Sequence, residues 1–443
     1  MFQMLLSFAG HAVGRVPSPW LLFLLFFYTI YLFCALIVPS VANAAAGILM
    51  VMGLCGAYRF KTYFYMVSVA EKWLLISYAL FSLVSIVSFF YWPQNRDARM
   101  HLEDYLTFLM LVPLYFLLRQ FRINFNGVVF MLAIVSISLG IVSVAQYVGV
   151  KYFQTFLFGF DRGWSSVLRP SGGVNPMRYA AISLIFAAFS LNYILLVRHK
   201  RNWMKLISSL AVIMGFIACF LTQSRGTFIS IPILAFACGV YLYRAGHPRF
   251  LLVLVVGALL FVGGVSQNSR VQSTIDSVVS YHRGDSNSNL GSRLDMFEAA
   301  VILIGRNPAW GHGLNSYSRN ASEIRKNTPG MDISVGMWNN PHNEILLVMV
   351  EKGVVGLITL LLLFAAPAYL FLQELRKADE SSSGQQVKFY AMCGLSLLIV
   401  YAVAGQSVAL FEHDVFNHFF ALMVLLFASQ IRVIGYMEER CCS

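Results

Sequence analysis

Residues 339–374, NNPHNEILLVMVEKGVVGLITLLLLFAAPAYLFLQE, pass without interruption from a polar turn into a long apolar run that starts at Ile345. An apolar stretch of about 20 residues is long enough to cross a bilayer as a helix. Comparable runs recur along the whole chain, although the one near Ala44 is marginal. We therefore expect an all-α polytopic membrane protein with about twelve transmembrane helices. The runs begin near Trp20, Ala44, Trp73, Tyr105, Val128, Tyr179, Leu206, Phe228, Leu251, Ile345, Phe389 and Phe419.

The composition excludes a soluble protein. Of the 443 residues, 58% are hydrophobic and only 12% are charged, whereas soluble domains carry about 25% charged residues. Folded in water, such a chain would expose large apolar patches. The net charge of +12 would suit a nucleic-acid partner, but an excess of Lys and Arg in cytoplasmic loops explains it better. We therefore expect the lipid bilayer as a partner and no nucleic acid.

The cysteines and the first apolar run predict neither a disulfide framework nor a cleaved signal peptide. None of the seven cysteines lies within residues 266–344, the long polar segment of the chain. We therefore expect no disulfide framework there, and no Cys/His spacing resembles a zinc site. The run near Pro19 is long enough to span the bilayer, so we interpret it as a retained helix and not as a cleaved signal peptide.

The distribution of Lys and Arg among the short loops predicts the orientation. In the opposite set of loops, positive charges are offset by acidic residues, or the loop is acidic, as in Glu412-His413-Asp414. We therefore expect both termini in the cytoplasm and the 266–344 segment on the outer face. The cytoplasmic loops would be those that contain Arg59, Lys61 and Lys72; Arg119 and Arg122; Arg198, Lys200, Arg201 and Lys205; Arg244 and Arg249; and Arg376, Lys377 and Lys388.

This pattern divides the chain into three parts. Residues 1–265 form a transmembrane bundle of about nine helices, residues 266–344 form an outer loop with catalytic elements, and residues 345–443 add about three helices and a short tail. Within the loop, residues 293–304 have apolar positions at helical spacing and predict an amphipathic helix lying on the bilayer. We expect Ser292 to cap this helix and Asn307-Pro308 to end it.

His342 is the first candidate for chemistry. We expect Asn340 to cap the helix that enters the membrane and Pro341 to take its first position, so that His342 lies in the first turn. The positive end of the helix dipole disfavours an imidazolium there. A neutral imidazole is what a general base needs, and the free N–H groups of the same turn form an anion site. The alternative is an interfacial histidine that only caps the helix.

Arginines on the outer side are candidates for binding a phosphate. Arg225 lies in a turn at the outer mouth of a span, and Arg293 follows a Ser/Asn/Gly-rich stretch. Arg169 and Arg178 frame a loop rich in Gly and Pro that could approach a ligand closely. The planar fork of arginine binds two phosphate oxygens. The alternatives are snorkelling or solvated arginines with structural roles.

The segment from Gly311 to Tyr317 resembles a phosphate loop only superficially, because no strand precedes it, so we reject a nucleotide site. His312 lies within this segment, and its alternative to a binding role is a purely structural one. Glu351 lies nine residues after His342, or about 13 Å along a helix. We expect this carboxylate at membrane depth to pair internally and not to act as the base.

Five motifs in order resemble the O-antigen ligase and O-antigen polymerase superfamily. The match covers about residues 220–360, and the span count and the single large loop extend the likeness over the whole chain. One departure is Phe297, where a tryptophan is commoner, and it should affect packing more than chemistry. The motifs are Ser224-Arg225-Gly226, Ser292-Arg293-x-x-x-Phe297, Asn307-Pro308-x-x-Gly311-x-Gly313-x-x-x-Tyr317, Pro341-His342-Asn343-x-x-Leu346 and Glu351-x-Gly353-x-x-Gly356.

The resemblance implies a membrane glycosyltransferase of the GT-C type in the cell inner membrane, with a periplasmic active site. The donor would be a glycan on undecaprenyl diphosphate and the acceptor lipid A–core, without a cofactor or a metal. His342 carries over as the base, and Arg225 and Arg293 carry over as diphosphate ligands. We take Arg169, Arg178, Asn343, His312 and Tyr317 as candidate substrate-binding residues.

The residues support this chemistry independently. Transfer from a diphosphate leaving group needs its developing charge stabilised and the acceptor hydroxyl activated. A metal often supplies the first, but Asp276, Asp285 and Asp295 are too dispersed to read as a metal cluster. Arginines would then replace the metal, and attack opposite the diphosphate predicts inversion.

Three other functions remain open. A polymerase would use a second lipid-linked repeat as the acceptor, and a protein O-oligosaccharyltransferase would use a protein. A transporter would place ionisable residues at the bilayer midplane in repeated halves, whereas this chain has few charges within its spans and no visible half-repeat. The sequence does not identify the glycan, the acceptor sugar or the oligomeric state.

Overall fold

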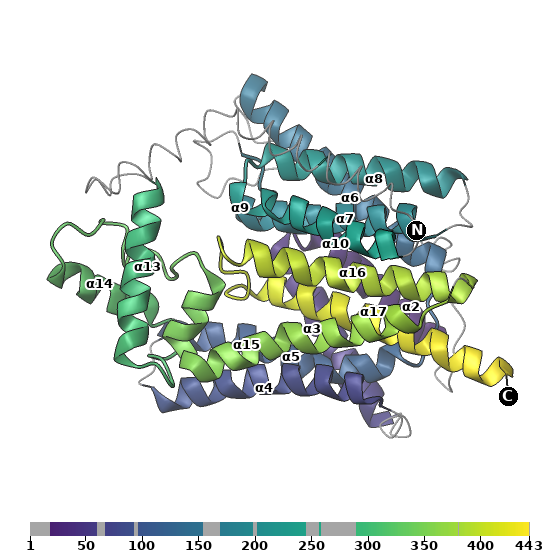
Figure 1. Ribbon diagram of the computed structural model, residues 1–443, viewed down its shortest axis with the longest axis horizontal. Helices are drawn as coiled ribbons and strands as arrows, with labels where there is room; N and C mark the ends of the chain where they lie inside the picture. The colour runs from purple at the N-terminus through teal and green to yellow at the C-terminus, as the bar shows by residue number, and fades with distance from the viewer. Residues whose placement is uncertain are drawn as a thin grey trace.

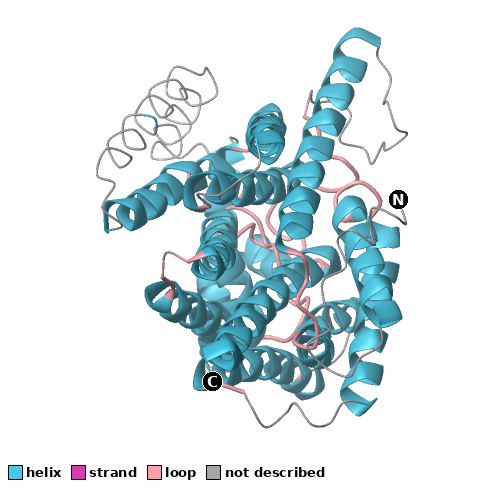
Figure 2. Cartoon of the chain, turned by 90° about the vertical axis from the view of Figure 1, so that its right-hand side faces the viewer, coloured by secondary structure: helices cyan, strands magenta, loops and turns pink. Residues whose placement is uncertain are grey.

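The computed structural model describes residues 18–59, 67–92, 96–153, 169–197, 202–244, 257, 289–379 and 381–442. These residues form helices and loops, and no strand occurs among them. Figure 2 looks along the helices and shows the same all-helical character. Ten of the described helices are long and apolar enough to cross a membrane. The predicted class, a polytopic α-helical membrane protein, is therefore confirmed.

The ten candidate spans match ten of the twelve expected apolar runs. The run near Trp20 forms a shorter apolar helix, α2 (Ser18–Cys34), and the run near Leu251 falls mainly outside the described residues. A short π-helix, Gly149–Phe153, continues α6. The spans are α3 (Pro39–Arg59), α4 (Val69–Tyr91), α5 (Arg96–Leu118), α6 (Phe125–Val148), α7 (Pro176–Leu196), α8 (Asn202–Leu221), α9 with α10 (Arg225–Phe228 and Ser230–Arg244), α15 (Glu344–Lys377), α16 (Ser382–Ala404) and α17 (Asp414–Cys442).

The spans lie lengthwise beside one another, and two further helices, α13 (Asn289–Arg306) and α14 (Tyr317–Asn327), lie at one end (Figure 1). The interior is aromatic near the start of α17, where Phe411 packs its ring against those of Phe108, Phe420 and Tyr401. Because lipid tails are as apolar as leucine, close packing of this kind holds membrane helices together.

α15 is broken nine residues after its start. Gly353 has φ +62°, a left-handed conformation that glycine adopts without steric cost. The break frees the carbonyls of Val350 and Glu351, which accept the N–H groups of His312 (2.7 Å) and Gly313 (3.0 Å). In return, the N–H of Val354 donates to the carbonyl of Pro308 at 2.8 Å. The Asn307–Gly313 segment therefore satisfies the backbone groups that the break exposes, as an apolar environment demands.

α13 and α14 pack on the N-terminal part of α15. Buried Met296 and Leu303 of α13 share a cluster with Ile324 of α14 and Leu347 of α15. The amphipathic helix predicted for residues 293–304 is confirmed, and it ends before Asn307-Pro308 as expected. The expectation that its apolar face lies on the bilayer is wrong, because protein covers that face. Ser292 does not cap it either, because α13 already includes Asn289.

Candidate functional site

His342 lies just outside α15 and not in its first turn. The helix begins at Glu344, and the N-cap is Asn343, whose side-chain oxygen accepts the N–H of Leu346 at 3.1 Å. The expectation that Asn340 caps the helix and Pro341 begins it is therefore wrong. Asn340 instead uses its side-chain oxygen to accept the N–H of His342 at 2.8 Å. His342 has φ +56°, an uncommon conformation for a residue with a side chain that marks a locally constrained turn.

The imidazole of His342 is neutral at physiological pH. Burial, followed by the positive charges of Arg293 and Arg178, lowers its pKa from 6.5 to about 4. We expected a neutral imidazole because of the helix dipole, whereas burial and two arginines are the causes in the structure. A neutral imidazole can accept a proton from a hydroxyl group. The same electrostatic coupling shows that residues far apart in the sequence lie near one another.

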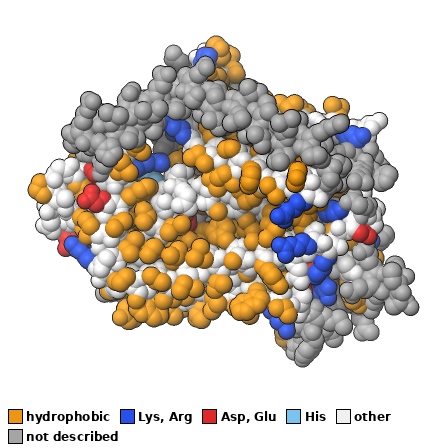
Figure 3. Space-filling model, viewed as in Figure 1, with side chains coloured by type: hydrophobic (Ala, Val, Ile, Leu, Met, Phe, Trp, Pro, Cys, Tyr) orange, Lys and Arg blue, Asp and Glu red, His pale blue; other side chains and the backbone are white. Residues whose placement is uncertain are grey.

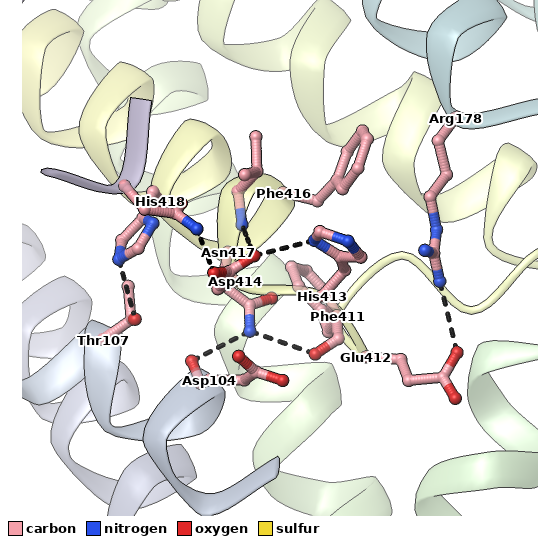
Figure 4. Close-up of polar contacts among 12 residues, drawn as sticks. Asp104, Thr107, Arg178, Phe411, Glu412, His413, Asp414, Phe416, Asn417 and His418 are labelled. Atoms are coloured by element: carbon pink, nitrogen blue, oxygen red, sulfur yellow. Dashed lines mark hydrogen bonds and ion pairs between the residues drawn. The ribbon is translucent and has the colours of Figure 1, made fainter. Parts of the chain in front are cut away.

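Arg178 projects from the first turn of α7 towards the turn that precedes α17 (Figure 4). Its Nη2 donates to the carbonyl of Ala409 at 2.7 Å and to the carboxylate of Glu412 at 3.2 Å. The guanidinium also lies over the ring of Phe416 at 5.6 Å from the centroid. Both charged side chains are nearly buried. Arg178 therefore holds the 409–412 segment and contributes positive charge near His342.

Glu412 links Arg178 to the His342 turn. The carboxylate oxygen that pairs with Arg178 also accepts a hydrogen bond from the side-chain amide of Asn340, and Asn340 in turn holds the N–H of His342. Sequence reasoning missed Glu412, which we considered only as part of an acidic outer loop. That acidic triplet was the available signal, but its partner on α7 is 234 residues away.

Glu344 fixes the same segment from the first turn of α15. Its carboxylate accepts the N–H groups of Leu410 (2.6 Å) and Phe411 (3.0 Å), and its own N–H donates to the carbonyl of Gly405 at 2.7 Å. The 405–412 segment is thus fastened to α15 by Glu344 and to α7 by Arg178. This second carboxylate was also missed by sequence reasoning.

Arg293 and Arg225 come together although 68 positions separate them in the chain. Burial, followed by the positive charge of Arg225, lowers the pKa of Arg293. Among the described residues, no salt bridge joins Arg293 to a carboxylate, and its Nη2 contacts the sulfur of Met177 at 3.6 Å. Figure 3 shows Lys and Arg side chains at the edge of a hollow near the α13 end. The positive charges of Arg225 and Arg293 act on each other, so an anion would be favoured near them.

The turn that carries Arg225 is held by Arg169. The Nε of Arg169 donates to the carbonyl of Thr222 at 2.7 Å, and its Nη2 donates to the hydroxyl of Ser224 at 3.3 Å. Gly226 follows, and a Cβ there would lie 1.9 Å from the hydroxyl oxygen of Ser407. The Ser-Arg-Gly motif therefore presents Arg225 on a turn that packs tightly against the 405–412 segment.

The three other predicted binding residues have contacts that hold the backbone. His312 bonds the carbonyl of Leu303 through Nε2 at 2.8 Å and stacks on Trp92. Tyr317 is buried and donates its hydroxyl hydrogen to the carbonyl of Met296 at 3.0 Å. Asn343 caps α15. No contact with a substrate is tested for any of them, so their binding roles stay predictions.

Glu351 pairs internally, as expected. Its carboxylate accepts the N–H of Asn315 at 2.8 Å and the hydroxyl of Tyr105 at 3.3 Å. The neighbouring Lys352 donates to the hydroxyl of Ser85 at 3.2 Å and lies over the ring of Tyr105. Both side chains are buried at the break in α15. They brace the junction between α15 and α4.

The arrangement offers a base and an anion site in one place. A neutral imidazole can take a proton, and guanidinium groups can stabilise negative charge that develops on a leaving group. Among the described residues, no three His, Cys, Asp or Glu side chains are grouped so that they could hold a metal ion. The cations that the described residues place near His342 are arginines.

The middle of the chain matches the model of a known protein family. Residues 210–361 match the family model described as O-antigen ligase. Arg225, Arg293 and His342 all fall within the match, whereas Arg178 and Glu412 lie outside it. The contacts above thus join the matched region to two segments beyond it.

Two curated proteins are similar to the chain. An uncharacterized protein of Haemophilus influenzae is 23% identical over 415 residues, which cover 92% of this chain and 96% of that protein. An O-antigen ligase of Escherichia coli K12 is 24% identical over 219 residues, which cover 46% of this chain and 49% of the ligase.

Proposed function

The chain belongs to the O-antigen ligase and polymerase superfamily, and on that premise we propose that it is an O-antigen ligase. The donor is a glycan on undecaprenyl diphosphate, and the acceptor is lipid A–core oligosaccharide. The partial match to an O-antigen ligase favours this activity over polymerisation. The chain itself is a multi-pass membrane protein.

The observation that carries the proposal is the neutral His342 beside arginines. His342 removes the proton from the acceptor hydroxyl while the acceptor oxygen forms a bond to the anomeric carbon of the donor. The bond between that carbon and the diphosphate oxygen breaks, and undecaprenyl diphosphate leaves with the electron pair. Arg293 and Arg225 stabilise the leaving diphosphate. They lower the barrier because the negative charge that they bind grows in the transition state. Attack from the opposite face inverts the anomeric configuration.

The distribution of surface charge supports a periplasmic site in the inner membrane. Figure 3 shows Lys and Arg side chains gathered at the end opposite α13 and α14. Positive loops favour the cytoplasmic side, so the end that carries His342 faces the periplasm. A membrane-embedded chain suits a lipid-linked donor, which can arrive from the bilayer while the acceptor sugar arrives from the water.

A deletion strain tests the proposal. Loss of a ligase yields rough lipopolysaccharide and accumulated lipid-linked polymer. Lipopolysaccharide that carries a single repeat would instead identify a polymerase, and loss of glycan from proteins alone would identify a protein O-oligosaccharyltransferase. Unchanged lipopolysaccharide would contradict the proposal, and a purified protein that moves the lipid-linked glycan across vesicles without forming a glycosidic bond would identify a transporter.

A further inference from the structure

The loop that precedes His342 is held rigidly against α14. The carbonyl of Gly336 accepts the hydroxyls of Ser318 (2.6 Å) and Ser322 (3.3 Å). Gly336 has φ +85°, and a Cβ there would lie 2.1 Å from the hydroxyl oxygen of Ser322. At the start of the loop, the N–H of Asp332 donates to the carboxylate of Asp295 on α13 at 2.8 Å. The loop therefore presents its side chains from a fixed backbone.

Trp338 is the side chain that this loop displays beside the base. Its ring centroid lies 5.7 Å from that of His342, with the two planes inclined at 53°. The indole nevertheless remains 46% exposed. A large aromatic surface that is fixed in place, open to a ligand and adjacent to a catalytic group is a preorganised contact.

The position of the acceptor follows from the chemistry of the base. A hydroxyl that loses its proton to His342 lies about 3 Å from an imidazole nitrogen. The sugar ring that bears this hydroxyl then falls within contact distance of Trp338. The C–H groups of a sugar ring are weakly positive and pack on the negative face of an aromatic ring. The arginines bind the diphosphate of the donor. Trp338 is therefore available to contact the acceptor sugar.

We infer that Trp338 is the stacking surface for the acceptor sugar and thereby determines acceptor affinity. This inference rests on the proposed function and adds to it a binding contact outside the base and the arginines. Neighbouring Ile333 and Met337 are also exposed. A loop that exposes three apolar side chains could alternatively insert among lipids. Insertion needs only apolar surface, whereas stacking needs an aromatic face, so substitutions separate the two.

The test uses purified full-length protein in vesicles, with lipid-linked glycan and rough lipopolysaccharide extracted from the deletion strain. Transfer rates are measured while the concentration of each substrate is varied in turn. Trp338→Ala should raise the acceptor KM about ten-fold, the size expected for loss of one good aromatic contact, and leave the donor KM within about two-fold. Trp338→Phe should recover most of the acceptor affinity, and Trp338→Leu should not.

Trp310→Ala is the matched control, because Trp310 is similarly exposed but lies beside Tyr91, at 6.3 Å between ring centroids. Its acceptor KM should stay at the wild-type value. An unchanged acceptor KM in Trp338→Ala, full affinity in Trp338→Leu, or a rise in the donor KM alone would overturn the inference. If the wild-type protein transfers no glycan to lipopolysaccharide, the proposed function itself fails and the inference falls with it.

Discussion

At the residue scale, the site depends on one histidine kept neutral by its surroundings. An ordinary histidine has a pKa near 6.5, so an exposed base would lose its function in mildly acidic conditions. His342 is half-buried instead, and its burial, followed by the charges of Arg293 and Arg178, keeps the imidazole unprotonated. Arg293 is also one of the two arginines proposed to bind the diphosphate. Base and anion site thus support each other electrostatically.

The pH dependence of transfer follows from this pKa. The unprotonated imidazole is the active form, so kcat/KM should stay level as pH falls from 8 to 5.5 and decline only as pH approaches about 4. A histidine with a pKa of 6.5 would be about 90% protonated at pH 5.5. Arg293→Gln removes one cause of the lowered pKa, so its acid limb should move to higher pH. A wild-type inflection near pH 6.5 would contradict this assignment.

The two clustered arginines should not tolerate exchange for lysine. Lysine keeps the charge but loses the planar fork that binds two oxygens. Arg225→Lys and Arg293→Lys should each lower kcat/KM by about ten-fold or more, with the leaving group as the affected partner. Arg306→Lys is the control on the same helix, because Arg306 is exposed and pairs only loosely with Glu323 at 3.9 Å. Full activity in both Arg225→Lys and Arg293→Lys would show that transfer requires only a positive charge at these positions and not the guanidinium fork.

At the element scale, the 405–412 segment unites the site. Glu344 holds it from α15, and Arg178 holds it from α7. Through Glu412 and Asn340 it also determines the backbone turn at His342. The contacts of this segment join α7, α9, α15 and α17 at the end of the molecule that carries His342.

Loss of Glu412 should therefore disturb the site without removing any group that touches substrate. Glu412→Ala leaves a nearly buried guanidinium unpaired, which is strongly unfavourable, and it releases Asn340. Transfer should fall at least about ten-fold, with a lower midpoint of thermal unfolding, and Glu412→Gln should lie between this variant and the wild type. Glu374→Ala removes an exposed pair with Lys377 and should change neither measurement. Normal transfer by Glu412→Ala would refute the linking role.

How far the sequence predicts these elements depends on the range of the interactions. Apolar runs are local, so the spans and the amphipathic α13 could be predicted. The choice of Asn343 as the N-cap of α15 could not, because Asn340 and Asn343 are equally good caps by residue type. In the structure, the side chain of Asn340 bonds Glu412, 72 positions away, and the N–H of His342. The break at Gly353 was likewise hidden, because its backbone groups are satisfied by residues some 40 positions earlier. The pairing of Arg178 with Glu412 could not be predicted either, because the two residues lie 234 positions apart.

At the scale of the whole molecule, the long apolar helices form one bundle with α13 and α14 at one end (Figure 1). The end that carries α13 and α14 and the opposite end differ in charge as well as in structure (Figure 3). A lipid-linked donor has to reach the site from the bilayer, and an acceptor sugar has to reach it from the aqueous side. This function requires the α13 end to face the periplasm.

Cysteine accessibility tests this orientation. In a cysteine-free background, Ile333→Cys in the loop before His342 should react with a membrane-impermeant maleimide in cells whose outer membrane has been permeabilised. Lys377→Cys at the end of α15 should react only after the inner membrane is opened. Both native side chains are well exposed, so accessibility reports the side of the membrane and not burial. The reverse labelling pattern would place the site in the cytoplasm and contradict the proposed function.

Transfer by the purified protein tests the central claim most directly, by comparing wild type with His342→Asn. Asparagine tolerates the left-handed backbone conformation of His342 better than most residues, so this variant removes the imidazole with little disturbance of the turn. Lipid-linked glycan and rough lipopolysaccharide are supplied to equal amounts of each protein. The wild type should form the glycolipid, and His342→Asn should form it at least about 100-fold more slowly. Near-normal transfer by a well-folded His342→Asn would contradict the assignment of His342 as the base.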